Sequence, residues 1–381
     1  MPHHPTILGP LRVLQLIGSL PVGGAEDLVA AIATGLDPAR FEVTVATIGP
    51  PGPVAEELRQ AGVAVVSLGL DFKRDNFRSL VRGVRRLLRE VRPQVLHTHL
   101  YHPNLYGRLA ALGLGIPAVV ASVHNTYSRV KLHRRLWNFA LAPCTHRLLV
   151  SSPQVREDVR TYDWVNPGRL EVIPYGIRLE ELEIPDSREQ ARQRLGVEGF
   201  CAAVVGRLEE QKGHRFLLAA LPAVRQEAPD LTALLVGSGR EEQALRRQAR
   251  ELGLEETARF LGTRRDLPLI FRAADLFVQP SLWEGLPLAL LKAMGSGLPP
   301  VATRVSGVAD VIEDGVNGFL TPPGDSPALA RAMIELYRQP LLRQQMGAAA
   351  RATVAQRYSL EAMLRRLAAL YENLATSRRG N

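Results

Sequence analysis

Residues 279–300 of the chain read QPSLWEGLPLALLKAMGSGLPP, and this order of residue types predicts a strand end, a turn and a helix. A polar turn carrying Glu284 and Gly285 leads into Pro287. Proline is well tolerated in a first helical turn, because its missing N–H would be unpaired there. The apolar run that follows should end at the glycines of residues 295–297.

The start of this helix predicts an anion-binding site. Unpaired amides of a first helical turn, together with the helix dipole, favour a negative charge, and Gly285 lets a ligand approach the backbone closely. Glu284 lies beside that position. A carboxylate there is unfavourable unless it accepts hydrogen bonds from another part of the ligand, and sugar hydroxyls can donate them. The segment is therefore interpreted as a binding site for a phosphorylated sugar.

Length and composition limit the class of protein. With 381 residues and 46% hydrophobic content, the chain can form two cores, so we expect two domains. The two cysteines, Cys144 and Cys201, are far apart and form no disulfide framework or metal-type spacing. The most apolar run, 109–123, is interrupted by Gly and Pro, and residues 1–10 lack the apolar core of a signal peptide. We therefore expect a cytoplasmic protein.

The net charge of +9 requires an explanation. Only four of the 47 basic residues are lysines, and the remainder are arginines. No zinc-finger spacing, RNA-binding aromatic signature or basic tail is present, so a nucleic-acid partner is not expected. Basic clusters at 73–74, 82–89 and 129–135 fit anionic lipid head groups or a phosphorylated acceptor, and solvated helix faces are the alternative.

The first half of the chain alternates apolar strands with helices. Such alternation predicts a mainly parallel sheet covered on both faces, whose ligands bind at the carboxyl ends of the strands. That rule selects residues 18–26, 97–102 and 124–125 as candidate binding positions. Strands are expected at 12–17, 41–48, 64–68, 95–99, 118–124, 146–151 and 170–173.

Each of these positions leaves alternatives open. Gly23 and Gly24 precede a helix, so their amides could hold a phosphate, but a tight turn is the more common reason for such a pair because the dinucleotide fingerprint is absent. His97 and His99 point to the same side of a strand, where a packing or hydrogen-bonded role is favoured over metal ligation. His124 ends a strand, and its role is structural or catalytic.

A charged stretch with Pro185 and Gly196 marks the domain junction at residues 178–198, and the alternation restarts at 201–205. The next loop carries Arg207 and Lys212. A planar guanidinium and a compact ammonium on one strand-to-helix loop can carry the negative charge of a diphosphate; solvent-facing cations are the alternative.

Taken in order, these segments resemble the family-4 retaining glycosyltransferases across nearly the whole chain. The resemblance implies an α/β protein of the GT-B class, in which two Rossmann-like doubly wound domains face each other across a cleft. The motifs that carry it are GGAE at 23–26, HTH at 97–99, SVHN at 122–125, VGRLxxxKG at 205–213, LVGxG at 235–239, FLG at 260–262, PSxxEGLP at 280–287, AMxxGxP at 293–299 and DGxNGF at 314–319.

The resemblance also implies a division of the chain. Residues 1–177 would form an acceptor domain, 178–198 a linker, and 199–359 a domain that binds the nucleotide-sugar donor. The last helix, at about 360–374, would pack back on the first domain.

Roles for single residues follow from the resemblance. Arg207 and Lys212 would bind the donor diphosphate, Glu284 the sugar hydroxyls, and the amides of Gly285 and Leu286 the terminal phosphate. These cations and the helix start would stabilise the departing diphosphate, so no metal or other cofactor is expected.

The remaining members of the expected site lie on other loops. Gly23 and Gly24 would lie against the terminal phosphate, and His124 would approach the reacting carbon of the donor sugar. Gly237 and Arg264 complete the expected donor-binding set, with Arg264 beside the base. The expected catalytic residues are His124, Glu284, Arg207 and Lys212.

Three positions depart from the family pattern. Lys292 stands where a second glutamate accepts hydrogen bonds from the ribose, so an acceptor has become a donor and the charge is reversed. We expect Lys292 either to contact the nucleotide as a donor or to weaken donor binding. Tyr175 replaces an asparagine before Gly176, and Asp310 replaces a glutamate.

The sequence thus predicts a retaining, metal-independent hexosyltransferase. Its donor would be a UDP-sugar and its acceptor a lipid-linked or other cell-envelope glycan, reached at the inner face of the cell membrane. Two alternatives remain: a catalytically silent GT-B partner subunit, which Lys292 suggests, and a GT-B sugar-nucleotide epimerase or sugar-phosphate synthase.

Overall fold

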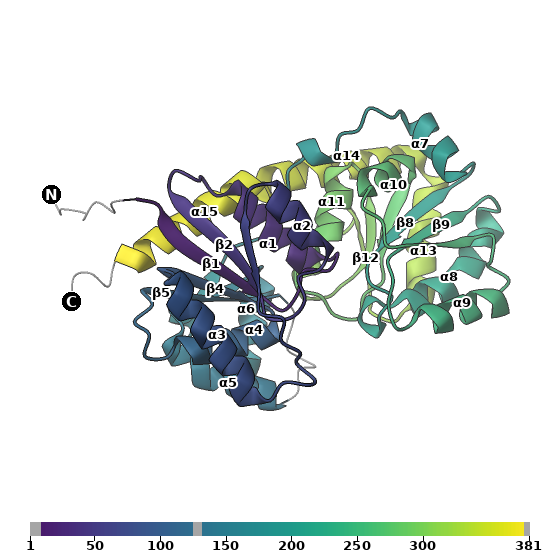
Figure 1. Ribbon diagram of the computed structural model, residues 1–381. Helices are drawn as coiled ribbons and strands as arrows, with labels where there is room; N and C mark the ends of the chain where they lie inside the picture. Colours follow the sequence, from purple (N-terminus) through teal and green to yellow (C-terminus); the bar gives the residue numbers. More distant parts are fainter. Residues whose placement is uncertain (1–8, 125–131, 377–381) are drawn as a thin grey trace. The chain divides into compact units, whose positions relative to one another are not determined.

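The computed structural model describes residues 9–124 and 132–376 of the chain. It divides into two compact units. The first runs to Tyr175 and takes up the C-terminal segment from Leu360, and the second comprises Gly176–Ser359. The chain therefore passes from one unit to the other twice (Figure 1).

The first unit contains a seven-stranded parallel sheet in the order β3-β2-β1-β4-β5-β6-β7. β4 and β5 are buried at every position, as expected for central strands covered on both faces. The strands are β1 (Leu11–Ile17), β2 (Phe41–Thr47), β3 (Ala64–Ser67), β4 (Val95–His99), β5 (Ala118–Val123), β6 (Arg147–Val150) and β7 (Leu170–Val172).

Helices cover both faces of this sheet. One core joins strand residues such as Leu14 and Leu96 to Leu80 and Val84, and a second joins Val45 to the helices on the other face. The helices are α1 (Gly24–Gly35), α2 (Pro53–Gln60), α3 (Phe77–Val91), α4 (Tyr101–Ala111), α5 (Leu132–Leu141), α6 (Pro153–Asp163) and α15 (Leu360–Thr376), with short 3₁₀ turns at η1 (Ala142–Cys144) and η2 (Pro167–Arg169).

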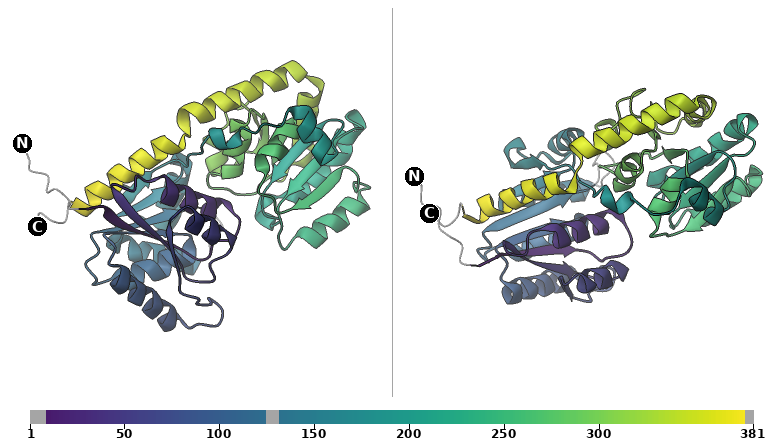
Figure 2. Two further views of the ribbon diagram at one scale, coloured as in Figure 1. Left: turned by 45° about the horizontal axis from the view of Figure 1, so that its top comes forward. Right: turned by 90° about the horizontal axis from the view of Figure 1, so that it is seen from above.

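The last helix, α15, packs against the first unit (Figures 1 and 2). Arg366 donates to the carbonyl oxygen of Val172 at 2.6 Å, and Glu372 pairs with Arg40 at 2.6 Å. Tyr371 is fully buried beneath the sheet-facing side of the helix. The contacts of α15 are therefore part of the fold of the first unit.

The second unit contains a six-stranded parallel sheet in the order β10-β9-β8-β11-β12-β13. Its strands are β8 (Cys201–Val205), β9 (Thr232–Val236), β10 (Ala258–Gly262), β11 (Leu276–Gln279), β12 (Pro300–Thr303) and β13 (Phe319–Thr321). Its helices are α7 (Arg188–Leu195), α8 (His214–Glu227), α9 (Glu242–Glu251), α10 (Leu267–Ala273), α11 (Leu288–Gly295), α12 (Ser306–Ala309), α13 (Ser326–Arg338) and α14 (Pro340–Arg357), with η3 (Glu180–Leu182) and η4 (Glu210–Lys212). The expectation of two doubly wound α/β domains is confirmed.

Residues 178–198, which we expected to be a linker, lie in the second unit instead. α7 begins with a capping box formed by Ser187 and Gln190, and Ala191 packs with residues of α10. Arg188 pairs with Asp275 at 2.7 Å. The charged residues that suggested a linker therefore make an anchored helix.

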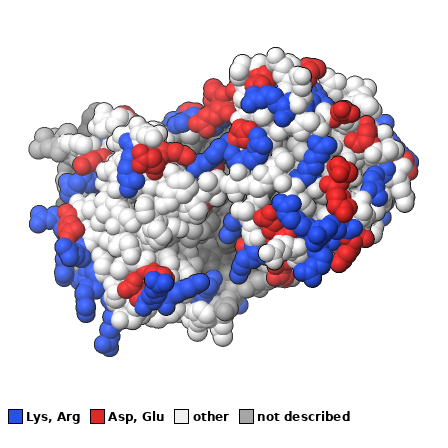
Figure 3. Space-filling view, turned by 45° about the vertical axis from the view of Figure 1, so that its right-hand side comes forward, with Lys and Arg blue, Asp and Glu red and all other residues white. Residues whose placement is uncertain are grey.

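Charged side chains are spread over the surface rather than gathered in one block. On the face drawn in Figure 3, basic and acidic side chains intermingle over the second unit. Most ion pairs of the described residues have exposed partners, for example Arg246 with Glu242 at 2.9 Å. Such pairs contribute little to stability, roughly 0–1 kcal/mol each.

Candidate active site

Glycines bring the loops at the carboxyl ends of β8, β9 and β11 into direct contact. A Cβ on Gly213, whose φ is 64°, would lie 2.0 Å from the carbonyl oxygen of Pro280. A Cβ on Gly237, whose φ is 141°, would lie 2.0 Å from the carbonyl oxygen of Gly206. Both positions therefore require glycine for conformational and steric reasons. The sequence segments around 206–213, 237 and 280 are thereby brought together.

The turn at 280–287 leads directly into α11. Pro287 is the N-cap, with Leu290 and Leu291 donating their amides to its carbonyl oxygen at 3.1 and 3.3 Å. The helix therefore begins one residue after the proline that we placed in its first turn. The carbonyl oxygen of Gly285 packs against Gly307, where a Cβ would approach to 1.9 Å. The first turn of α11 thus lies at the carboxyl edge of the sheet.

Glu284 is the centre of a hydrogen-bonded cluster at this edge, and it is only 4% exposed. Its Oε1 accepts from Lys212 Nζ at 2.5 Å, from Ser281 Oγ at 2.8 Å and from Gln279 Nε2 at 3.2 Å. Its Oε2 lies 3.4 Å from Gln211 Nε2. A buried carboxylate needs such donors, because burying it alone would be costly. The sequence placed Lys212 and Glu284 in one site, and here they form an ion pair.

The other two expected cations of this unit differ in their surroundings. Arg207 is exposed on the loop after β8. Arg264 is held side-on by Asp266, with Nε to Oδ1 at 2.8 Å and Nη2 to Oδ2 at 2.5 Å. The hydrogen bond to Arg264 lowers the pKa of Asp266, and the same bond raises the pKa of Arg264. The edge of the Arg264 guanidinium formed by Nε and Nη2 is therefore occupied within the loop.

In the first unit, His124 belongs to a chain of buried polar side chains. Its Nδ1 lies 2.7 Å from Tyr175 Oη, and its Nε2 lies 3.2 Å from His99 Nδ1. The His99 Nε2 lies 2.5 Å from Gln15 Oε1. Tyr175, which departs from the family asparagine, therefore holds one nitrogen of the histidine expected to be catalytic.

The chain continues into the C-terminal helix. Gln15 Nε2 donates to Tyr371 Oη at 3.1 Å, and that hydroxyl lies 2.5 Å from His97 Nδ1. The His97 Nε2 lies 2.7 Å from Ser122 Oγ. One continuous chain therefore connects β1, β4 and β5 to α15.

Hydrogen positions along this chain follow from the Gln15 amide. With its oxygen facing His99, that histidine must carry its hydrogen on Nε2, because an amide oxygen only accepts. A neutral His99 then accepts at Nδ1, so His124 donates from Nε2 and accepts from Tyr175 at Nδ1. By the same reasoning Tyr371 donates to His97, which donates to Ser122. Each hydrogen bond of the chain then joins one donor to one acceptor.

Burial keeps these histidines neutral. It lowers the pKa of His97 to about 3 and that of His124 to about 4, and it lowers the pKa of His99 well below 6.5. Burial also raises the pKa values of Tyr175 and Tyr371. Among the described residues, no carboxylate is hydrogen-bonded to any of the three rings, so a charged ring would not be compensated. His124 is therefore held as a neutral ring with both nitrogens occupied.

Gly23 and Gly24 lie at the carboxyl end of β1. Gly24, which we expected to precede the helix, is the first residue of α1, and Gly23 is its N-cap in an extended conformation. A Cβ on Gly23 would approach Glu26 Oε2 to 2.4 Å. Of the expected site residues, these two glycines and His124 belong to the first unit, and all the others belong to the second. Asn125, the other residue expected beside His124, lies outside the described residues.

Comparison with known proteins identifies the chain. Residues 22–181 match the family described as Glycosyltransferase Family 4, and residues 200–339 match that described as Glycosyl transferases group 1. A phosphatidyl-myo-inositol mannosyltransferase of Mycobacterium leprae is 34% identical over 302 residues, which cover 77% of each chain. The chain belongs to glycosyltransferase family 4. The resemblance predicted from the motifs is therefore confirmed, and so is the expectation of an enzyme.

Two further comparisons extend over most of this glycosyltransferase. A UDP-Gal:alpha-D-GlcNAc-diphosphoundecaprenol alpha-1,3-galactosyltransferase of Escherichia coli is 30% identical, covering 68% of this chain and 70% of that protein. The structure of Anabaena Alr3699/HepE in complex with UDP-glucose is 26% identical with a TM-score of 0.85, covering 95% of this chain and all of that one.

The histidines of the glycosyltransferase that were considered as metal ligands make other contacts. His97 and His99 share one side of β4, with ring centroids 4.0 Å apart, but hydrogen bonds occupy both nitrogens of each. His102 stacks on Phe72 with centroids 4.6 Å apart. Within residues 9–124 and 132–376, no group of three His, Cys, Asp or Glu side chains is arranged to hold a metal ion.

The departures from the family pattern have definite positions in the glycosyltransferase. Lys292 is half-buried on α11, and its carbonyl oxygen accepts from Ser296 Oγ at 2.9 Å. Asp310 follows α12, and its carbonyl oxygen accepts from Tyr358 Oη at 3.3 Å. Neither residue disrupts the element that carries it.

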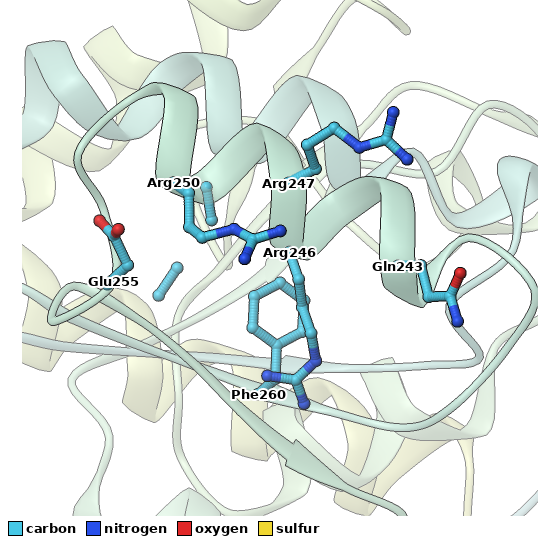
Figure 4. A pocket seen from close by; sticks show the side chains of 8 residues that line it. Gln243, Arg246, Arg247, Arg250, Glu255 and Phe260 are labelled. Atoms are coloured by element: carbon cyan, nitrogen blue, oxygen red, sulfur yellow. The ribbon is translucent and has the colours of Figure 1, made fainter.

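A separate hollow of about 470 Å³ lies between α9 and β10 of the glycosyltransferase (Figure 4). Arg246 covers the Phe260 ring at 4.6 Å, and Arg247 and Arg250 extend from the same helix. None of the expected site residues line it. It is therefore distinct from the candidate active site.

Sequence reasoning missed the residues that hold the site in place. Gln15 is a polar residue inside the apolar strand LRVLQLI, and that isolation was the available signal. Ser281 and Gln279 flank Glu284 in the quoted segment but gave no separate indication. Tyr371 lies in the last helix, 274 positions from His97, and nothing local connects the two.

Proposed function

We propose that this glycosyltransferase moves a hexose from a UDP-sugar to a lipid-linked or other cell-envelope glycan, with retention of anomeric configuration and without a metal ion. The single observation that carries the proposal is the Glu284 cluster at the start of α11. The Glu284 carboxylate, the Lys212 ammonium and the N-terminus of α11 meet at the carboxyl edge of the sheet, as recognition of a sugar diphosphate requires.

The two oxygens of Glu284 have different capacities. Oε1 takes three donors within the unit, whereas the Gln211 contact of Oε2 is long at 3.4 Å. A carboxylate offers about four lone-pair positions, so Oε2 retains room for sugar hydroxyls. We therefore assign hydroxyl recognition to Oε2, while Oε1 keeps the side chain fixed.

Charge on the leaving diphosphate is assigned to Lys212, Arg207 and the first turn of α11. Lys212 is held near the turn by Glu284, and Arg207 is exposed on the same loop. Fixed cations and amides perform the electrostatic task that a divalent ion performs elsewhere. In this proposal the backbone amides of Gly285 and Leu286 contact the terminal phosphate, and Gly23 and Gly24 lie against it.

The neutral state of His124 restricts its role. With a pKa of about 4 and both nitrogens engaged, it is a poor general base near neutral pH. We propose that it presents a fixed surface to the donor sugar. Gly237 and Arg264 would border the nucleotide, and Lys292 would donate to its ribose or phosphate.

Names of relatives support the donor and the acceptor class. The Escherichia coli relative is named for a UDP-sugar donor and a diphosphoundecaprenol acceptor, and the Mycobacterium leprae relative for a phosphatidylinositol acceptor. The Anabaena structure contains UDP-glucose. Among residues 9–124 and 132–376, no helix has the length and apolar character needed to span a bilayer. We propose that the enzyme reaches such an acceptor peripherally, at the inner face of the cell membrane.

The test combines binding with turnover. Thermal shifts with UDP, GDP, ADP and TDP should show stabilisation by UDP, and a UDP-hexose with a polyprenyl-diphosphate sugar in detergent should give a product whose anomeric configuration, measured by NMR, matches the donor. Glu284→Gln should abolish most transfer, while the exposed Glu210→Gln should not. The proposal would be contradicted if none of the four nucleotides stabilised the protein, or if the product had the inverted anomeric configuration.

A further inference from the structure

The helix α5 turns most of its large apolar residues outward. It buries Asn138 and Leu141 and half-buries Arg134 and Arg135, whereas its other large apolar side chains are exposed. A helix at the surface of a globular protein ordinarily shows the opposite arrangement. The exposed fractions are 60% for Leu132, 50% for Leu136, 39% for Trp137 and 50% for Phe139.

Polar contacts beneath α5 fix this orientation. Asn138 Oδ1 accepts from Arg108 Nη2 at 2.8 Å, and Asn138 Nδ2 donates to Asp163 Oδ2 at 2.5 Å. Arg135 Nε donates to the carbonyl oxygen of Tyr162 at 2.6 Å, and Arg134 lies over the Tyr101 ring at 4.4 Å. Rotating the helix to bury its apolar side would leave these buried partners unsatisfied. The outward apolar face is therefore built into the fold.

Neighbouring elements enlarge the apolar face. Phe77, at the start of α3, stacks on Trp137 with centroids 6.1 Å apart, and Trp164, just after α6, meets Phe139 edge-on at 6.3 Å. Trp164 has a φ of 53°, which is unusual for a bulky residue. We call these six residues the α5 surface: Phe77, Leu132, Leu136, Trp137, Phe139 and Trp164. They are six of the ten large apolar side chains that the described part of the chain exposes.

A basic row adjoins the α5 surface. α3 exposes Arg78, Arg82, Arg86 and Arg89 at helical spacing, and α3 and α5 lie on the same side of the first unit (Figure 1). Of these, Arg86 pairs with Glu90 at 2.8 Å. Of the basic cluster at 129–135, residues 132–135 belong to α5, and the others lie outside the described residues.

We propose that the α5 surface and the arginine row of α3 dock the first unit on an anionic lipid bilayer. Tryptophan, phenylalanine and leucine on one face of a surface helix enter the boundary between head groups and acyl chains, and adjacent arginines are attracted to anionic head groups. An anionic bilayer accounts for both features, the apolar face and the line of arginines that borders it, and association with a second copy of the chain is tested below. The proposal rests on the proposed function, since a lipid-linked acceptor would be taken from that bilayer.

Vesicle co-sedimentation of the full chain tests the docking surface. We expect binding to vesicles of phosphatidylcholine with phosphatidylglycerol, weaker binding to phosphatidylcholine alone, and loss of binding at high salt. Leu136→Ser with Phe139→Ser should lower the partition coefficient at least tenfold, and Arg78→Glu with Arg82→Glu should do so only on anionic vesicles.

Matched controls come from the second unit. Leu341, 66% exposed on α14, provides Leu341→Ser, and the exposed pair on α9 provides Arg247→Glu with Arg250→Glu. Neither should change vesicle binding. Lipids brominated in the acyl chains should quench tryptophan fluorescence in the wild type, and Trp137→Phe with Trp164→Phe should remove most of that quenching. Equal binding by the α5 variants and the controls would overturn the proposal.

Failure of docking and failure of the proposed function give different results. An enzyme that transfers sugar to a water-soluble acceptor analogue but ignores vesicles would refute the docking surface alone. Vesicle binding that depends on α5, with no transfer from any nucleotide-sugar, would refute the function alone. If the protein is a dimer that Leu136→Ser with Phe139→Ser turns into a monomer without changing vesicle binding, the α5 surface is an interface between two copies, and docking is again refuted.

Discussion

Tyr371, near the end of the chain, places its hydroxyl oxygen 2.5 Å from Nδ1 of His97 in the centre of the first sheet. The same hydroxyl accepts from Gln15. Both partners are completely or almost completely buried, so water is unavailable to replace the tyrosine. The C-terminal helix is thereby joined to the interior that also holds His124.

Removing that hydroxyl should destabilise the first unit. Tyr371→Phe leaves a buried donor on Gln15 and a buried acceptor on His97 unpaired, so we expect a loss of about 1–3 kcal/mol in unfolding free energy. Urea denaturation followed by circular dichroism measures it. Tyr337→Phe, whose ring packs on Phe200 in the second unit, is the matched control. An equal stability of Tyr371→Phe and the wild type would show that the chain of hydrogen bonds is energetically unimportant.

Lys212 and Glu284 should be strongly coupled. Removing one partner of a buried pair leaves an uncompensated charge, which typically costs about 3–5 kcal/mol, so Glu284→Gln and Lys212→Met should each destabilise the second unit. The double variant should lose less than the sum of the two. A double-mutant cycle on unfolding free energies gives the coupling, and strictly additive losses would contradict the ion pair.

Transfer should depend on Glu284 beyond its effect on stability. At a temperature where folding is intact, Glu284→Gln should lower the transfer rate at least tenfold, equivalent to about 1.4 kcal/mol or more in the barrier. Steady-state kinetics with a UDP-hexose measures this, and Glu210→Gln is the control. Wild-type rates in Glu284→Gln would remove this side chain from the site.

Lys292→Glu should change donor preference. The substitution restores the acceptor of the family pattern, so it should alter which nucleoside diphosphate gives the largest thermal shift or increase that shift. A panel of four nucleoside diphosphates with both proteins tests this expectation. Identical shifts throughout the panel would place Lys292 outside the donor site.

Acid should destabilise the first unit before carboxylates are fully protonated. Below pH 6.5 the unfolded chain binds protons at His97 and His124, whereas the folded unit resists them until about pH 3 and pH 4. The unfolded state then binds more protons, so stability falls as pH falls, by about 1.4 kcal/mol per pH unit for each histidine. Asp163, whose pKa burial raises to about 6, acts in the opposite direction below that pH.

The pH effect is measured by urea unfolding at pH 7, 6 and 5. His97→Gln removes one titrating ring, so its stability should fall less steeply with pH than that of the wild type. The difference in slope should approach 1.4 kcal/mol per pH unit between pH 6 and 5. Parallel slopes for the two proteins would show that His97 is not kept neutral by the fold.

The fold was largely predictable because its strands are short, continuous apolar runs between turn residues. β4 and β8 begin and end where the sequence predicted. α6, α13, α14 and β13 were missed. α6 is too polar for a clear apolar stripe, and β13 has only three residues.

The sequence predicts the members of the candidate site but not their contacts. Glycines and cations on strand-to-helix loops have a local signature, which is why Gly237, Lys212 and Glu284 were predicted together, and the structure brings their loops to one sheet edge. Their mutual ion pair joins residues 72 positions apart and depends on loop packing. The hydrogen-bond chain through Tyr371 depends on which helix returns to which sheet, and pattern alone does not determine that.

The first unit is discontinuous in sequence, because α15 joins it after the chain has passed through the second unit. Translation that stopped after Tyr175 would release a first unit whose Gln15 and His97 lack their tyrosine partner. The first unit is therefore completed only once residues 360–376 have been synthesised. A polypeptide limited to the first unit should therefore join residues 360–381 to residue 175 rather than end at residue 175.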